Sequence, residues 1–360
     1  MNKIKLFDPS IDYKEKNTII KVLESKFWAS GSGIQNVEKF EKKFSKYVCS
    51  PVSVAVNSGT AALHLALSLF NIKNKEVILP SLSFVSTAHA VKYNGGIPIF
   101  ADIDPNTLCI DTNSIEEKIS KRTALILPVH FGGYPAELDK IAKICKKNKL
   151  NLVEDAAHAV GTRFKNKMIG THGDAVCFSF HPVKNLAMPA GGVITLNRNM
   201  KKFEKELKER RWCGISNRNF FEYDVNQIGW NYYMNEFSAA IGIVQLAKLE
   251  KLNHKRKNIA KRYFHELKSE NKMPFDNFCS YHLYWIRVKN RTKFIKNMLE
   301  KKIEVGIHYK PIDKMSMYSN KKVNPITEKI SKEIVSIPIH PNLTNDNINY
   351  IIKTINKLIK

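Results

Sequence analysis

A lysine stands between two apolar runs in the stretch Val176-Cys177-Phe178-Ser179-Phe180-His181-Pro182-Val183-Lys184, which is followed by Gly191-Gly192 and Val193-Ile194-Thr195-Leu196. Lysines are seldom fully buried without a partner, and burial lowers the pKa of the amine, so that its neutral, nucleophilic form becomes available. Ser179 lies five positions before Lys184, so its hydroxyl can reach a phosphate while the amine reaches an aldehyde on the same ligand. The stretch therefore indicates a candidate nucleophile at Lys184, with an ordinary loop charge as the alternative.

Short apolar runs alternate with amphipathic stretches from about Val52 onward. This alternation is typical of an α/β domain whose mostly parallel central sheet has helices on both faces. Ligands of such sheets bind at the carboxyl ends of the strands, where we expect the site. The predicted strands are 52–56, 77–79, 97–101, 124–129, 152–154, 176–180 and 193–196, and the predicted helices include 60–70, 86–93 and 137–149.

The pattern changes after about Leu249. It predicts a long charged helix, an aromatic strand and two further helices, in that order, at 251–270, 281–288, 293–302 and 345–359. No repeat or long flexible linker separates the two parts. We therefore predict a large α/β domain over 1–249, with an N-terminal arm, packed closely against a smaller α+β domain over 250–360.

The composition argues against several classes of protein. With 43% hydrophobic residues among 360, the chain can bury a core large enough for a cofactor enzyme. No segment approaches the run of about 20 apolar residues that crosses a bilayer, so we expect a cytoplasmic protein without a membrane partner. The six cysteines stand singly with no C-x-x-C spacing, which speaks against a zinc site or a disulfide framework, and we expect no metal.

The formal net charge of +25 raises the question of a nucleic-acid partner. The lysines are spread along the chain at spacings that fit solvated helix faces, for example over 140–149, and no recognition motif accompanies them. We therefore expect no nucleic-acid partner, although the positive field would attract an anionic nucleotide substrate.

Two further segments complete the candidate site. In Asn57-Ser58-Gly59-Thr60, at the start of a predicted helix, the glycine permits close backbone approach, while hydroxyls and free N–H groups can bind a phosphate. Another apolar strand delivers Asp155 to the carboxyl edge, where a carboxylate can keep a heterocyclic nitrogen protonated. Taken singly, Ser58, Thr60 and Asp155 can equally be helix caps. Together with Lys184, these segments supply the phosphate cradle, the acid and the amine that an enzyme dependent on pyridoxal 5'-phosphate (PLP) uses.

With these motifs the chain resembles the DegT/DnrJ/EryC1/StrS sugar aminotransferases, which have the type I, aspartate aminotransferase-like fold of PLP-dependent transferases. The resemblance extends over nearly the whole chain. It is carried by Phe40-Glu41, Ser58-Gly59-Thr60-Ala61-Ala62-Leu63, Pro80-Ser81-Leu82-Ser83-Phe84-Val85, Glu154-Asp155-Ala156-Ala157-His158, Ser179-Phe180-His181-Pro182-Val183-Lys184, Asn231-Tyr232, Ala239-Ala240-Ile241-Gly242, Gln245-Leu246 and His308-Tyr309.

The resemblance implies roles for the residues around the cofactor ring. Lys184 would hold PLP covalently, and Asp155 would pair with the ring nitrogen. Phe84 would stack on the ring, and His158, where many relatives have Gln, would lie near the ring hydroxyl. Without the resemblance, Phe84 can be a core residue and His158 an ordinary buried histidine.

The resemblance also implies how the phosphate is bound. Gly59, Thr60 and Ser179 would bind it within one subunit. Asn231, which can otherwise be a turn residue, would reach it from the neighbouring subunit, so that a homodimer with shared active sites is implied.

The implied reaction moves an amino group, with glutamate as the expected donor, onto a keto sugar carried on a nucleoside diphosphate. We expect a 4-keto-6-deoxy sugar and a role in amino-sugar or surface glycan biosynthesis, with His308 and Tyr309 near the substrate. Two motifs depart from the family pattern, because an acidic residue is replaced in Pro189-Ala190-Gly191-Gly192 and an arginine by Tyr233. Lys310 can compensate for the lost cation.

Two other functions are open at this point. A related branch of the family removes a sugar hydroxyl, but it carries His at the position of Lys184, so the lysine speaks against dehydration. A transcription regulator with an aminotransferase-like domain would need an added helix-turn-helix, and the sequence before Val52 does not predict one.

Overall fold

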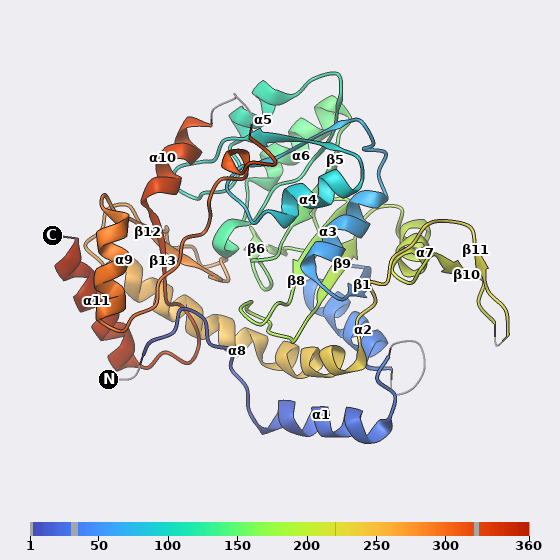
Figure 1. Cartoon of the computed structure of the whole chain (residues 1–360), viewed down its shortest axis with the longest axis horizontal. Coiled ribbons are helices and arrows are strands. Elements are labelled where there is room, and N and C mark those ends of the chain that lie inside the picture. Colours follow the sequence, from blue (N-terminus) through green and yellow to red (C-terminus); the bar gives the residue numbers. More distant parts are fainter. Residues whose placement is uncertain (1–2, 30–34, 220, 320–323, 360) are drawn as a thin grey trace.

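The computed structural model describes residues 3–29, 35–219, 221–319 and 324–359, and a seven-stranded sheet lies at the centre of this part of the chain (Figure 1). Its strands are β1 (Val52–Val56), β2 (Glu76–Pro80), β3 (Ile97–Ala101), β4 (Thr123–Ile126), β5 (Asn151–Asp155), β8 (Ala175–Ser179) and β9 (Gly192–Leu196). Their order in the sheet is β1-β9-β8-β5-β4-β2-β3. Neighbours from β8 to β3 are parallel, whereas β9 runs antiparallel to both β8 and β1. The predicted mostly parallel α/β sheet is confirmed.

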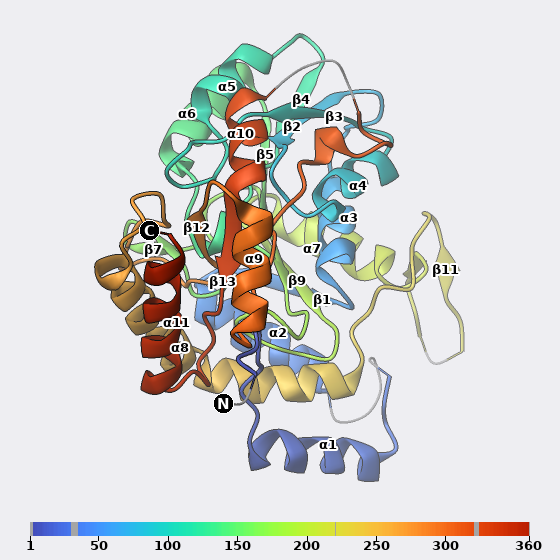
Figure 2. The same cartoon turned by 60° about the vertical axis from the view of Figure 1, so that its left-hand side comes forward.

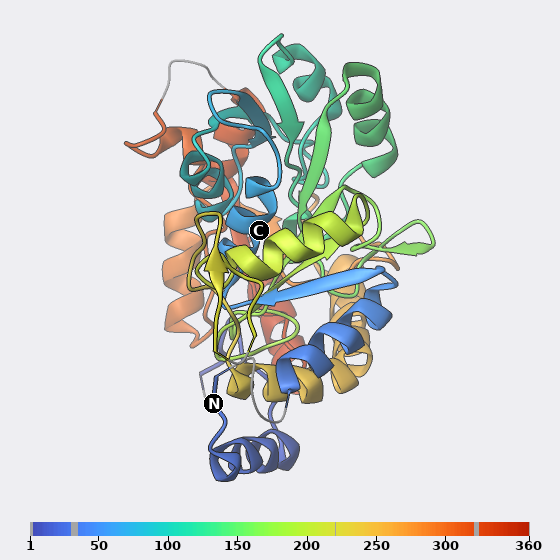
Figure 3. The same cartoon turned by 90° about the vertical axis from the view of Figure 1, so that its right-hand side faces the viewer.

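Helices cover both faces of the sheet. Successive side chains of a strand point to opposite faces, so a strand of apolar residues has to be covered on both sides. On β1, Val54 and Val56 pack into the core that α3 (Gly59–Ser68), α4 (Ser86–Tyr93) and α7 (Met200–Arg210) complete. Ala55 faces the other way, toward α2 (Asn36–Val48) and α8 (Glu236–Glu266). Figure 3 shows β1 between α7 on one side and α2 on the other. On this second face α5 (Thr112–Lys118) and α6 (Leu138–Asn148) cover the sheet farther along.

The C-terminal part holds a small antiparallel pair, β12 (Tyr284–Arg287) and β13 (Ile334–Ile337). Helices α9 (Arg291–Glu300), α10 (Pro325–Glu333) and α11 (Asn345–Leu358) accompany this pair (Figure 2). The helix predicted at 251–270 instead begins at Glu236, because the Asn235 side chain caps it by accepting from the N–H of Ser238 at 2.8 Å. The division into 1–249 and 250–360 falls within this continuous helix, so we keep it as a proposal.

Two helices precede β1 that the sequence pattern did not predict. Both α1 (Tyr13–Ser25) and α2 pack against α8, and Figures 1 and 2 show α1 alongside that helix. Glu15 of α1 accepts a hydrogen bond from Gln245 at 2.6 Å, which fixes α1 to α8. Among the described helices, none has both the length and the hydropathy that a bilayer crossing requires.

A hairpin of β10 (Ile215–Ser216) and β11 (Asp224–Val225) projects from the body of the protein (Figures 1 and 2). Its side chains include the large apolar Phe221, which is 96% exposed, and Ile228, which follows the hairpin and is 82% exposed. The remaining short elements are β6 (Arg163–Phe164), β7 (Lys167–Met168) and the 3-10 turns η1 (Phe131–Gly133) and η2 (Ile312–Lys314).

Phe178 tests the packing of β8 against the helices of the second face. Its ring is fully buried and makes an edge contact with Phe44 of α2, with 5.1 Å between ring centroids. Phe178→Ala should lower the free energy of unfolding by about 3–5 kcal/mol, because it removes a large buried side chain and leaves a cavity. Phe27→Ala, at a half-exposed ring, is the control. Chemical denaturation of both variants measures the difference, and equal losses would contradict this packing.

Candidate functional site

The site forms where several strands end at one edge of the sheet. β1, β5 and β8 point the same way, so the residues that follow Val56, Asp155 and Ser179 meet at this edge. The antiparallel β9 starts there, with Gly192 paired to both Val56 and Ser179. The loop that carries Lys184 therefore leaves and re-enters the sheet at the same edge.

A cavity of about 450 Å³ opens at this edge. It brings together the residues predicted for the site, apart from Asn231; those that line it are Gly59, Thr60, Phe84, Asp155, His158, Ser179, Lys184, His308 and Tyr309. Asn231 is exposed and pairs with Trp212 in an isolated bridge after the projecting hairpin. Phe84 is 56% exposed, so it is a wall of the cavity and not a core residue.

A narrow cradle lies at the start of α3. The Ser58 hydroxyl accepts from the N–H of Ala61 at 3.1 Å, so this serine does cap the helix. A Cβ atom on Gly59 would come within 2.6 Å of the Cβ of Ser179, so only glycine fits between the two segments. The cradle therefore combines the positive end of a helix with the hydroxyls of Thr60 and Ser179, a set of groups that suits a phosphate.

Asp155 is a buried carboxylate with two fixed donors. Its Oδ2 accepts from the Thr87 hydroxyl at 2.8 Å, and its Oδ1 accepts from the N–H of Ala157 at 3.1 Å. Burial raises the pKa of Asp155 above its ordinary value, while these donors and the charges of Lys184 and His130 act in the opposite direction. Each oxygen still has a lone pair for a ligand, so a protonated ring nitrogen fits this position as hydrogen-bond donor and as partner charge.

Lys184 lines the cavity as a half-buried side chain. Burial of the amine lowers the pKa of Lys184 to about 8, although the charge of Asp155 acts to raise it. Since the amine is neutral above its pKa, about a tenth of it is neutral and nucleophilic at pH 7. The Nζ atom lies 3.4 Å from Nε2 of His282.

His158 and Tyr309 form a pair whose proton positions follow from their partners. The N–H of Gly132 donates to Nδ1 of His158 at 3.2 Å, so that nitrogen carries no proton. Burial holds the pKa of His158 well below its usual value, with the charges of Lys184 and His308 as further causes, so the ring is neutral. Its Nε2–H therefore donates to the Tyr309 oxygen, 3.1 Å away. The Tyr309 hydroxyl proton is then free to donate to a ligand in the cavity.

Three residues of this region were not anticipated as site residues from the sequence: Thr87, His130 and His282. His130 is fully buried, and its Nδ1 accepts from the N–H of Ala136 at 3.1 Å. Its Nε2–H therefore donates to Glu154, 2.8 Å away, which also accepts from the N–H of Gly173. The available signal for His130 was its place just after a predicted strand. Thr87 and His282 carried no such signal.

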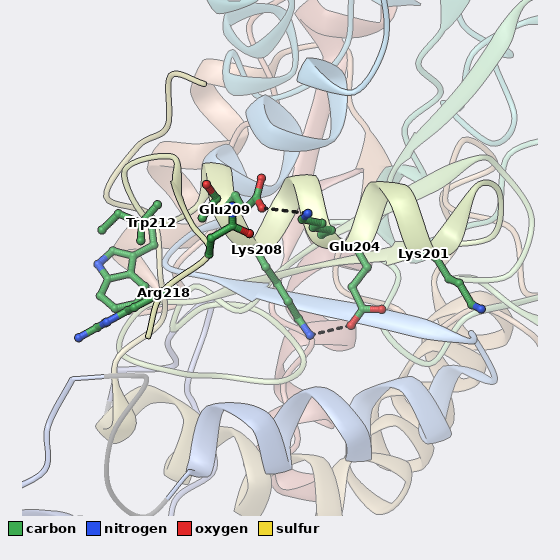
Figure 4. Close-up of a pocket in the computed structure, with 10 residues that line it drawn as sticks. Lys201, Glu204, Lys208, Glu209, Trp212 and Arg218 are labelled. Carbon is green, nitrogen blue, oxygen red and sulfur yellow. Dashed lines mark hydrogen bonds and ion pairs between the residues drawn. The ribbon is translucent and has the colours of Figure 1, made fainter. Parts of the chain in front are cut away.

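A second hollow, of about 390 Å³, lies beside α7 and differs in chemistry (Figure 4). Charged side chains line it and pair with one another, as Lys208 does with Glu204 at 2.6 Å. Within the described part of the chain, its walls include none of the predicted site residues. Since charged pairs on α7 dominate this hollow, such as Lys208 with Glu204 and Lys205 with Glu209, the cavity at the sheet edge remains the candidate site.

The chain is similar to known proteins over nearly its whole length. The sequence pattern of the DegT/DnrJ/EryC1/StrS aminotransferase family matches residues 9–356. The chain is 32% identical to GDP-perosamine synthase of Escherichia coli O157:H7, over 99% of each chain.

Two solved structures are similar over almost their full length. PseC of Helicobacter pylori, an aminotransferase involved in the biosynthesis of pseudoaminic acid, has a TM-score of 0.94 and 28% identity, with 99% of each chain covered. The PLP form of the putative sugar aminotransferase Spr1654 of Streptococcus pneumoniae has a TM-score of 0.93 and 25% identity, covering 99% of this chain and 98% of that one.

The two hydrogen bonds that the Glu154 carboxylate accepts at the end of β5 can be tested by substitution. Glu154→Ala leaves the Nε2–H of His130 and the N–H of Gly173 buried without an acceptor, which should cost on the order of 3 kcal/mol of unfolding free energy. Glu204→Ala, which breaks the partly exposed pair with Lys208, should cost less than about 1 kcal/mol. Denaturation curves of the two variants measure both values. A Glu154→Ala protein as stable as the Glu204→Ala protein would refute this arrangement.

Proposed function

From the premise that the chain belongs to the DegT/DnrJ/EryC1/StrS aminotransferase family, we propose that it transfers an amino group onto a keto sugar carried on a nucleoside diphosphate. The chain is an aminotransferase, and its cofactor is PLP. The observation that carries the proposal is one cavity in which the amine of Lys184, the carboxylate of Asp155 and the cradle at Gly59 face the same space. No single one of these groups would suffice.

In this proposal the predicted residues hold the cofactor. Gly59, Thr60 and Ser179 bind the phosphate in the cradle that only a glycine permits. Asp155 holds the ring nitrogen protonated, and Lys184 provides the covalent attachment. When bound, PLP supplies an electron-accepting ring and an aldehyde that carries the amino group from donor to acceptor.

The ring is completed by side chains on its faces and edges. Phe84 stacks on one face, which its exposed position on the cavity wall supports. His158 lies near the ring hydroxyl, and Tyr309 keeps a donor proton for the substrate. Burial also raises the pKa of Tyr309, so its hydroxyl is a donor and not a base at neutral pH.

Lys184 is also the base of the reaction. Its amine, once released, takes the proton from the carbon that carries the amino group of the donor. A pKa of about 8 suits this role, because the neutral amine is already populated near pH 7 and the ammonium form can return the proton.

The sugar is proposed to be a 4-keto-6-deoxy sugar and the amino donor glutamate. The wall made by Val183, Pro189 and Ala190 is apolar and suits a deoxy carbon. By the family resemblance, Pro189-Ala190 stands where members commonly carry an acidic residue, so we expect this wall to differ from theirs. His308 lies on the same cavity and is placed near the sugar by this proposal.

The assembly is proposed to be a homodimer with shared sites. The hairpin before Asn231 extends away from its own subunit and exposes Phe221, Tyr223 and Val225. An exposed apolar patch of this kind suits a protein interface. Asn231, exposed and outside its own cavity, can then complete the phosphate site of the partner.

Lys184 and the substrate class can be tested together. Incubation of the PLP-loaded protein with glutamate and a panel of keto sugar nucleotides should yield an amino sugar, identified by mass and NMR. Lys184→Ala should abolish turnover, because both the covalent attachment and the base are lost. Lys293→Ala, at an exposed lysine of α9, should retain it. A fully active Lys184→Ala enzyme would end the proposal.

Sharing of the site between subunits predicts complementation. Lys184→Ala and Asn231→Ala should each have little activity, but a hybrid dimer of the two has one intact site. Random reassembly of an equal mixture should therefore restore about a quarter of wild-type activity, because half of the dimers are hybrids with one active site each. A mixture of Lys184→Ala with itself is the control. No recovery in the hybrid would show that Asn231 does not act across subunits.

A further inference from the structure

A histidine outside the predicted set touches the reactive amine. His282 lies just before β12, in the C-terminal part of the chain, and its ring is 2% exposed. Its Nε2 is 3.4 Å from Nζ of Lys184, whereas its Nδ1 is buried with no protein partner among the described residues. The imidazole thus directs one nitrogen at the lysine, and no second hydrogen bond from the described part of the chain fixes its ring.

The segment that carries His282 is held in place beside Lys184. Asn185, the next residue after the lysine, donates to the carbonyl of Ser280 at 2.8 Å. The N–H of Leu283 donates to the carbonyl of Gly132 at 3.2 Å. Between them, Tyr281 has φ of 51°, a left-handed conformation that costs a bulky residue energy and persists only where the surroundings impose it. The position of the imidazole is therefore imposed by its neighbours on both sides.

The surroundings also keep the ring neutral. Phe7 stacks on it with 5.7 Å between centroids, and His158 lies 4.4 Å away on the same measure. Burial holds the pKa of His282 well below its usual value, and the charge of Lys184 is the next cause. An ammonium group has only donors, so toward the charged form of Lys184 the Nε2 atom of His282 acts as the acceptor, which places the ring proton on Nδ1.

We propose that His282 is a positioning residue, which binds the free amine of Lys184 by a hydrogen bond to its Nε2 and holds it ready for proton transfer. What the amine then does rests on the proposed function, but the hydrogen bond does not. Because a neutral acceptor binds an ammonium more strongly than an amine, His282 opposes the effect of burial on Lys184. The other titratable groups that face this amine are Asp155, His158, His181 and His308.

The test measures the ionisation of Lys184 directly in the cofactor-free protein. A small amine-reactive reagent is applied over a range of pH, and mass spectrometry of the Lys184 peptide gives the midpoint of its reactivity. Exposed Lys293 serves as the internal reference. In His282→Phe the midpoint should fall by about one pH unit, because the acceptor of the charged form is lost. His282→Leu, with a smaller side chain, should show the same fall.

A rescue variant and a control variant distinguish a hydrogen bond from His282 to Lys184 from a general effect of losing a buried ring. His282→Gln keeps an acceptor close to the position of Nε2 and should restore the midpoint of the wild-type protein. His340→Phe removes another buried histidine, one that contacts the carbonyl of Lys5 and not Lys184, and should leave the midpoint unchanged. A midpoint that stays constant or rises in His282→Phe and His282→Leu would overturn the proposal. Because no substrate is involved, this result is independent of whether the chain aminates a sugar.

Discussion

In the proposed reaction the amine of Lys184 must remain partly neutral, although the same cavity holds the carboxylate of Asp155. The burial of the amine and the placement of both side chains at one sheet edge meet this requirement. Burial lowers the pKa of the lysine, while the carboxylate acts in the opposite direction. In the role proposed for Lys184, the neutral amine attacks an aldehyde and the ammonium returns a proton, so both forms must be accessible. The pKa of Lys184 therefore depends on how close its amine lies to the Asp155 carboxylate, and the sheet fixes where these two residues meet.

The sheet does so because β5 and β8 are paired neighbours, with Asp155 opposite Cys177. Antiparallel β9 then returns the Lys184 loop to the same edge and sets Gly192 opposite Ser179. Position is thus defined by backbone hydrogen bonds, which are stiffer than side-chain contacts. The C-terminal part adds His308 and Tyr309 to the cavity wall and brings His282 to 3.4 Å from the Lys184 amine. A site of this kind depends on both parts of the chain.

Much of the sheet edge could be predicted from the sequence, because Ser179 and Asp155 each follow a recognisable apolar run and parallel strands end together. The contacts of His282 and Thr87 could not, since they depend on how distant segments pack. The sequence pattern does not predict the first half of α8, because its first turns are apolar and small, without the charged pattern of its second half. The pattern does not predict α1 either, because only Glu15 and Val22 of this helix are buried and its apolar periodicity is correspondingly weak.

We propose that Lys184, and no other lysine, carries the cofactor. Reduction of the PLP-loaded protein with borohydride makes that bond permanent, and mass spectrometry after digestion then locates it. We expect the added mass of the cofactor on the peptide that contains Lys184, and we expect no added mass in the Lys184→Ala protein. The same mass on a different lysine, with the peptide of residue 184 unmodified, would contradict it.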